Sequence, residues 1–216
     1  MRRGIFGGTF NPIHLGHLRT AEEVRETCLL DSVLFIPSGN PPLKEADLAE
    51  AGHRYEMVRR AVEPNRHFGV SDIELQRTER SYTVTTLLEL RGRYPEDELF
   101  FILGIDAFLD IPAWWQPESV VRLVDFIVVT RPGFSMADAA RSPFLSFPAG
   151  ADPSLLSPPA SPLRLAGGRS AVFLPVTPLA LSSTAIRGLV REDRSIRYLV
   201  PEAVEEYIRS RGLYRR

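Results

Sequence analysis

The chain has 216 residues, of which 44% are hydrophobic and 25% are charged, proportions typical of one globular domain. Its formal net charge of −1 argues against a broadly basic surface for nucleic acid. The single cysteine, Cys28, excludes an intrachain disulfide. The N-terminus does not read as a signal peptide, and no apolar run is long enough to span a membrane, so we expect a cytoplasmic protein.

Apolar strands alternate with amphipathic helices over the first 130 residues. We predict strands at about 3–8, 32–37, 67–75, 98–104 and 125–130. We predict helices at about 15–30, 51–62 and 84–94. Strands that are apolar throughout favour a parallel sheet buried on both faces. The predicted fold is therefore α/β, a doubly wound (Rossmann-like), mostly parallel sheet, whose ligands bind beyond the carboxyl ends of the strands.

The remainder of the chain departs from this alternation. Residues 134–170 are rich in Pro, Ala, Ser and Gly, which predicts a long loop or irregular insertion. A last strand is expected at 171–175. From about 182 to 216 we predict a helical C-terminal part, with a terminal helix in PEAVEEYIRSRGLY that begins near Pro201 and ends at Gly212. The whole chain, 1–216, is predicted to form one domain.

The segment GGTFNPIHLGH at residues 7–17 has the pattern of a phosphate-binding turn. Gly7 and Gly8 follow the first strand and let the backbone approach a ligand closely. His14 and His17 lie three residues apart at the start of a helix, and therefore share a face. A helix N-terminus favours anions, and two imidazoles there add hydrogen-bond donors for a polyphosphate.

Four other interpretations of this segment have less support. Two capping or surface histidines after a glycine turn would be a purely structural arrangement. A zinc site would need a third ligand, for which Cys28 is poorly placed. A dinucleotide fingerprint, G-x-G-x-x-G, and a Walker loop, G-x-x-x-x-G-K-[ST], are both absent from the sequence.

Two segments together resemble the nucleotidyltransferase superfamily. GGTFNPIHLGH resembles its (H/T)xGH signature, and LSSTAIR at 181–187 resembles its second signature, ISSTxIR. Alone, SSTAIR would be a helix N-cap followed by a surface arginine. The resemblance implies that Ser183 and Thr184 hold the β- and γ-phosphates of ATP, with Arg187 as charge partner. It also places ATP against the four residues Gly7, Gly8, Thr9 and Phe10.

Shorter segments between these signatures resemble bacterial nicotinate-mononucleotide adenylyltransferases. PSGNPPLK at 37–44 would place Lys44 near phosphate, and SYT at 81–83 would place Thr83 at the pyridine ring. PAWWQ offers Trp114 as the aromatic platform, although packing is an alternative for it and for Trp115. On the adenosine side, the motifs GID and RPG contribute Gly104, Asp106 and Arg131.

The chain departs from the family pattern at two positions. Leu43 stands before Lys44 where the family usually has His, and Asn11 stands where Asp is frequent. Neither change affects the reaction class that the resemblance implies. Two alternatives stay open, a phosphopantetheine adenylyltransferase and a nucleotide-binding module of the same fold without turnover. Association into a homo-oligomer also stays open.

The resemblance implies attack by the 5′-phosphate of nicotinate mononucleotide on the α-phosphorus of ATP. A phosphate monoester is already anionic at neutral pH, because its second pKa is ~6, so no general base is required. His14, His17 and Arg187 would be catalytic, because they would stabilise the charge that develops on the phosphates. Mg²⁺ would enter with ATP, held by phosphate oxygens and water, and no metal site made of protein ligands is predicted.

Overall fold

The computed structural model describes the whole chain except residues 42–46, 131–132, 151, 153–161 and 216. In this described part, eight strands form one sheet in the order β3-β2-β1-β4-β5-β8-β7-β6. The strands are β1 (Arg2–Gly8), β2 (Ser32–Pro37), β3 (Phe68–Val70), β4 (Glu98–Gly104), β5 (Asp125–Thr130), β6 (Leu145–Ser146), β7 (Leu163–Leu165) and β8 (Ser170–Pro175). The first six in this order are parallel, and β7 and β6 continue the sheet antiparallel at one edge. The α/β, doubly wound prediction is confirmed.

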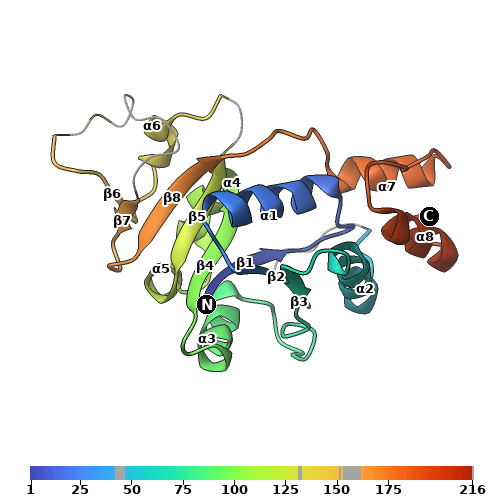
Figure 1. Ribbon diagram of the computed structural model, residues 1–216, viewed down its shortest axis with the longest axis horizontal. Coiled ribbons are helices and arrows are strands. Elements are labelled where there is room, and N and C mark those ends of the chain that lie inside the picture. Colours follow the sequence, from blue (N-terminus) through green and yellow to red (C-terminus); the bar gives the residue numbers. More distant parts are fainter. Residues whose placement is uncertain (42–46, 131–132, 151, 153–161, 216) are drawn as a thin grey trace.

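Helices cover both faces of the sheet. They are α1 (Leu15–Thr27), α2 (Ala51–Val62), α3 (Thr83–Arg93), α4 (Ile105–Leu109), α5 (Pro117–Leu123), α6 (Met136–Ala139), α7 (Ser183–Arg191) and α8 (Glu202–Arg211), with a 3₁₀ turn at Ile111–Ala113. Figure 1 shows α7 and α8 together at one end of the molecule and α6, β6 and β7 at the other. No helix among the described residues is both long and apolar enough to cross a membrane.

Two hydrophobic cores lie on opposite faces of the sheet, because successive side chains of a strand point to opposite sides. In β1, Ile5 belongs to the core under α3, α4, α5 and α6, whereas its neighbour Phe6 belongs to the core under α1, α2, α7 and α8. In β4, Phe101 and Ile102 divide in the same way. This burial on both faces explains why the strands are apolar at nearly every position.

Two sequence predictions need correction. The third strand was expected at 67–75 but ends at Val70, because the chain then turns, with the Leu75 N–H donating to the Asp72 carbonyl. The insertion at 134–170 was expected to be irregular, but its described part includes α6 and two strands that extend the sheet. No bounds were predicted for the short helices between β4 and β5.

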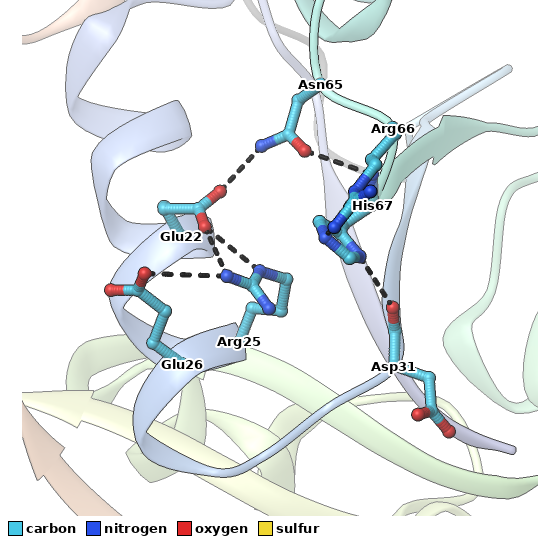
Figure 2. A network of polar contacts seen from close by, with 7 residues as sticks. All are labelled: Glu22, Arg25, Glu26, Asp31, Asn65, Arg66 and His67. Atoms are coloured by element: carbon cyan, nitrogen blue, oxygen red, sulfur yellow. Dashed lines mark hydrogen bonds and ion pairs between the residues drawn. The ribbon is translucent and has the colours of Figure 1, made fainter.

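Polar contacts fix the outer side of α1, the helix that carries the second histidine of the phosphate-binding motif. The Glu22 carboxylate accepts hydrogen bonds from Arg25 at 2.7 Å and from the Asn65 amide at 2.6 Å. Asn65 in turn accepts from the His67 backbone N–H just before β3. Figure 2 shows how this network joins α1 to the chain entering β3. These contacts are partly buried, and the Glu22–Arg25 pair lies within α1 itself, so the link from α1 to the chain before β3 is the hydrogen bond between Glu22 and Asn65.

Candidate active site

The phosphate-binding motif leaves the sheet at the carboxyl end of β1. Gly8 is the last residue of that strand, and a Cβ atom there would lie 3.0 Å from the Phe10 ring, closer than ordinary packing allows. Phe10 is 3% exposed, and its ring packs edge-on against His17 with the ring centres 5.2 Å apart. Its φ of +48° is a left-handed conformation that non-glycine residues seldom adopt. The Phe10 ring therefore packs against the His17 imidazole and helps to fix its position.

His14 and His17 form a stacked pair of imidazoles, with ring centres 3.7 Å apart. The backbone N–H of His14 donates to Nδ1 of His17 at 3.2 Å. Because an accepting ring nitrogen carries no proton, neutral His17 has its proton on Nε2. The sequence prediction that both histidines lie together at the start of α1 is confirmed, and His17 presents a neutral donor.

Burial keeps both imidazoles uncharged. It lowers the pKa of His14 to about 4. Burial is also the main cause that lowers the pKa of His17 to about 3, and the charge of His14 adds to it. At neutral pH the pair is therefore a set of hydrogen-bond donors that carries no net charge.

This pair should make the protein less stable in mild acid. Because the pKa values of His14 and His17 in the folded protein lie below the ordinary 6.5, the unfolded chain takes up protons first as the pH falls. The free energy of unfolding should therefore decrease below about pH 6.5, by up to about 1.4 kcal/mol per pH unit for each histidine. Urea unfolding at pH 7, 6 and 5 measures this slope. A double His14→Gln, His17→Gln variant with the slope of the parent protein would contradict the assignment.

The second signature, at the start of α7, packs directly against the first. Ser182 caps this helix, since its hydroxyl accepts from the Ala185 N–H at 3.1 Å. The Ser183 hydroxyl donates to the Pro12 carbonyl at 2.8 Å. The two segments, about 170 positions apart in the sequence, thus form one structure.

Arg187 is the buried link between these two signatures, with only 7% of its surface exposed. Its Nη1 donates to the Asn11 carbonyl at 2.7 Å, and its Nη2 donates to the Thr184 hydroxyl at 3.4 Å. Its buried Nε has no hydrogen-bond partner among the described residues. The guanidinium is thus held in place by two contacts, and each Nη nitrogen carries a second N–H beyond the one that these contacts use.

A hollow of about 500 Å³ lies where these residues meet. We call it the phosphate hollow; it is lined by Thr9, Phe10, Asn11, His17, Asp47, Ser183, Thr184, Arg187 and Arg191. Two guanidinium groups, a neutral imidazole donor and three hydroxyls suit a polyphosphate, whose oxygens accept hydrogen bonds and carry negative charge.

A second hollow, of about 290 Å³, opens on the other side of the motif. We call it the aromatic hollow; its lining includes Gly7, Gly8, Thr9, Ser38, Glu74, Ser81, Thr83, Thr86 and Trp114. Trp114 packs edge-on against Phe101, with the ring centres 6.4 Å apart. Trp115 does not line this hollow and is 58% exposed. Thr9 lines both hollows, so they adjoin at the end of β1.

Not every predicted site residue lines one of these hollows. His14, which stacks on His17, lines neither. Gly104 ends β4 and caps α4, Asp106 lies in the first turn of α4, and these two line neither hollow. Lys44 and Arg131 fall outside the described residues, as does Leu43. The roles of these residues, like those of the predicted site residues that line the hollows, stay predictions.

Arg54 was not among the predicted site residues, although its hydrogen bonds link segments that border the two hollows. Its side chain is 1% exposed and donates to three carbonyls, those of Thr9 at 2.9 Å, Gly39 at 3.1 Å and Ala49 at 2.9 Å. It thereby ties the phosphate-binding motif to the loop that borders the aromatic hollow. A signal was present, because Arg54 precedes the buried Met57 by three positions and so lies on the apolar face of α2.

Glu74 is a second residue that was missed, because it was placed in a strand. In the turn after β3 its carboxylate accepts from the Thr86 hydroxyl at 2.6 Å and from the Gly39 N–H at 3.4 Å. A Cβ on Gly39 would lie 2.2 Å from the Glu74 carbonyl oxygen, so only glycine fits there. Glu74 and Thr86 therefore shape the wall of the aromatic hollow.

Asn11, the departure from the family's frequent Asp, is 1% exposed and uses its whole side chain. Its amide nitrogen donates to the Asp47 carbonyl at 3.1 Å. Its oxygen accepts from the Ala49 N–H at 3.1 Å and from the Tyr214 hydroxyl at 2.8 Å. A carboxylate could not donate to Asp47, which gives a structural reason for the amide.

The described residues hold no group of three or more His, Cys, Asp or Glu side chains that could bind a metal ion. Of the described residues that line the phosphate hollow, Asp47 alone carries a carboxylate. A cation would therefore have to arrive with most of its ligands already in place.

Known proteins resemble this chain over nearly its full length. A family model described as cytidylyltransferase-like matches residues 5–189. A Geobacter sulfurreducens relative, named probable nicotinate-nucleotide adenylyltransferase, is 46% identical over 217 residues, covering 99% of this chain and 98% of the relative. A Desulfitobacterium hafniense relative of the same name is 44% identical, over 99% of this chain and 96% of its own length.

Solved structures share the fold. The Plasmodium falciparum nicotinic acid mononucleotide adenylyltransferase complexed with NaAD has a TM-score of 0.74 at 18% identity, over 99% of this chain and 97% of that one. The same enzyme complexed with APC has a TM-score of 0.71 at 17% identity, over 99% of this chain and 96% of that one. The family model and the curated relatives together show that this chain belongs to the cytidylyltransferase-like family, among the nicotinate-nucleotide adenylyltransferases.

Proposed function

We propose that this chain transfers AMP from ATP to nicotinate mononucleotide, giving nicotinate adenine dinucleotide and pyrophosphate in NAD biosynthesis. The observation that carries the proposal is the pair of hollows that adjoin at Thr9. One has the donors of a polyphosphate site, and the other has an indole wall suited to a flat pyridine ring. The relatives' names support the same substrate pair. The single cysteine suits the cytoplasm as the place of the reaction.

The reaction needs positioning more than acid–base chemistry. A phosphate oxygen of the mononucleotide forms a bond to the α-phosphorus of ATP, while the bond from that phosphorus to the bridging oxygen breaks and pyrophosphate leaves. The attacking phosphate is already ionised near neutral pH, since its second pKa is ~6. The motif residue Thr9 stands where the two hollows adjoin, so substrates held in them would bring the reacting groups together there.

The two signatures supply the charge stabilisation. His17, with Nε2–H as a neutral donor, would hold an α-phosphate oxygen, and its stacked partner His14 would support the β-phosphate side. Arg187, which lines the phosphate hollow, would bind the departing pyrophosphate through the second N–H groups of its Nη nitrogens. Ser183 and Thr184 would add hydroxyl contacts at the start of α7. Such donors act mainly on the transition state, where charge moves onto the bridging oxygen.

We propose Mg²⁺ as the companion of ATP. When bound, it neutralises phosphate charge and makes the pyrophosphate a better leaving group. Phosphate oxygens and water would supply most of its ligands, in keeping with the one carboxylate, that of Asp47, among the described residues that line the phosphate hollow.

Trp114 provides a test of the acceptor site with a built-in control. Trp114→Ala should raise the KM for nicotinate mononucleotide about tenfold, because stacking on an aromatic ring contributes about 1–3 kcal/mol in comparable sites, while the KM for ATP stays nearly unchanged. Trp115→Ala removes the neighbouring exposed indole, which does not line the aromatic hollow, and should change neither constant. Steady-state kinetics measure both. Equal increases in both KM values for Trp114→Ala would point to structural damage instead.

The proposed function is tested by a pyrophosphate-release assay with ATP and Mg²⁺. Nicotinate mononucleotide, nicotinamide mononucleotide and phosphopantetheine are supplied in parallel as acceptors. The proposal predicts the highest kcat/KM with nicotinate mononucleotide. Faster release with phosphopantetheine would assign the other acceptor, and no release with any of the three would leave a nucleotide-binding module without turnover.

A further inference from the structure

Arg191 lies one turn after Arg187 on α7, and both side chains line the phosphate hollow. Residues four positions apart on a helix share a face, so the two guanidinium groups approach the hollow from the same side. Only Arg187 is part of the ISSTxIR signature. Arg191 is thus a second cation at this hollow, and the proposed mechanism gives it no role.

The Arg191 guanidinium is paired with the Asp47 carboxylate at 2.6 Å. The two side chains are 37% and 48% exposed. An ion pair this open to water contributes little stability, so its exchange for another partner has a small cost. Pyrophosphate or the ATP triphosphate would offer more negative charge and more acceptor oxygens than a single carboxylate.

Asp47 stays at the rim of the hollow independently of this ion pair. Its carbonyl accepts a hydrogen bond from the buried Asn11 amide, and its φ of +61° is a conformation that Asn and Asp tolerate better than most residues. Asp47 also lines the hollow, so its negative charge faces the same space as an incoming polyphosphate. The carboxylate therefore competes with that ligand for Arg191 and repels it.

We propose that Arg191 is a further phosphate-binding residue, held by Asp47 while the hollow is empty and released to the polyphosphate when ATP enters or pyrophosphate forms. This inference rests on the proposed function, because it takes the occupant of the hollow to be a polyphosphate. The same inference implies that Asp47 weakens the binding of a polyphosphate in the hollow. The two partners of one ion pair should then have opposite effects on affinity.

Isothermal titration calorimetry with pyrophosphate and Mg²⁺, and separately with ATP and Mg²⁺, tests this inference on the full chain. Arg191→Met should weaken pyrophosphate binding about tenfold, the loss typical of a charge-assisted hydrogen bond. Asp47→Asn keeps the backbone conformation and should tighten binding about two- to fivefold. The control Arg194→Met removes an exposed arginine that pairs with Glu192 outside the hollow, and should change nothing.

A double variant, Arg191→Met with Asp47→Asn, isolates the contact of Arg191 with the ligand. It should bind pyrophosphate more weakly than Asp47→Asn alone, although the ion pair is absent from both proteins. The inference is overturned if Asp47→Asn and Arg191→Met weaken binding equally, since the pair would then only shape the rim. It is also overturned if the double variant binds like Asp47→Asn while the parent protein turns over normally. A parent protein that binds neither ATP nor pyrophosphate would overturn the proposed function together with this inference.

Discussion

Replacement of His17 by alanine is expected to lower kcat about 10²–10³-fold and to change the KM for nicotinate mononucleotide much less. The reason is the environment of the imidazole. Nδ1 is occupied by the His14 N–H, and burial lowers the pKa to about 3, so the ring presents a fixed, neutral Nε2–H. Such a donor reaches its full effect only when charge builds up on the phosphate oxygens.

Steady-state kinetics over pH 6 to 9 also test the protonation state of the pair. Because His14 and His17 are neutral throughout this range, neither should appear as an ionisation in the kcat profile. His67→Ala is a suitable control for the removal of an imidazole outside the site. The His67 ring contacts Asp31 and Arg66 and lines neither hollow. A His17→Ala enzyme with near parental kcat would remove His17 from the reaction.

Arg187→Met should have a comparable effect on kcat/KM for ATP, a loss of about 10²–10³-fold, because it removes a transition-state donor to the leaving group. It should also lower the free energy of unfolding by about 1–3 kcal/mol, since the buried Asn11 carbonyl would lose its partner. Chemical unfolding measures the second effect separately from activity.

Arg187→Lys separates the roles of charge and geometry. Lysine keeps the positive charge, but it cannot donate to Asn11, Thr184 and a phosphate through one planar fork. Activity between that of the parent and that of Arg187→Met is therefore expected. Full activity in both variants would show that Arg187 only joins the two signatures.

Strong local patterns were sufficient to predict much of the fold. The bounds of β2, β4, β5 and α2 agree with the predicted ranges, because apolar runs and helical spacing reflect burial directly. The predicted end of the third strand was wrong because the sequence DIEL fits two structures equally well. Its apolar residues could be buried in a strand or in a turn that packs against the sheet. The choice between them depends on backbone hydrogen bonds with β2, which no local pattern reveals.

The candidate site, like the fold, could be predicted from the sequence only in part. The motifs located His14, His17, Arg187 and Trp114, because their chemistry is carried by residue type and spacing. Arg54 was missed because its position on the apolar face of α2 is a weak signal, and no motif marks an arginine that binds three carbonyls. Packing between distant segments keeps His14 and His17 neutral and places Thr9 in the lining of both hollows. Sequence patterns do not show such packing.

The central claim is that a phosphate of nicotinate mononucleotide attacks the α-phosphorus of ATP in this site. Its most direct test supplies nicotinate mononucleotide with ¹⁸O in the non-bridging oxygens of its phosphate, together with ATP and Mg²⁺, and follows the label by mass spectrometry. The account predicts nicotinate adenine dinucleotide that retains all of the labelled oxygens, and unlabelled pyrophosphate. Label in the pyrophosphate, or the absence of the dinucleotide, would contradict it.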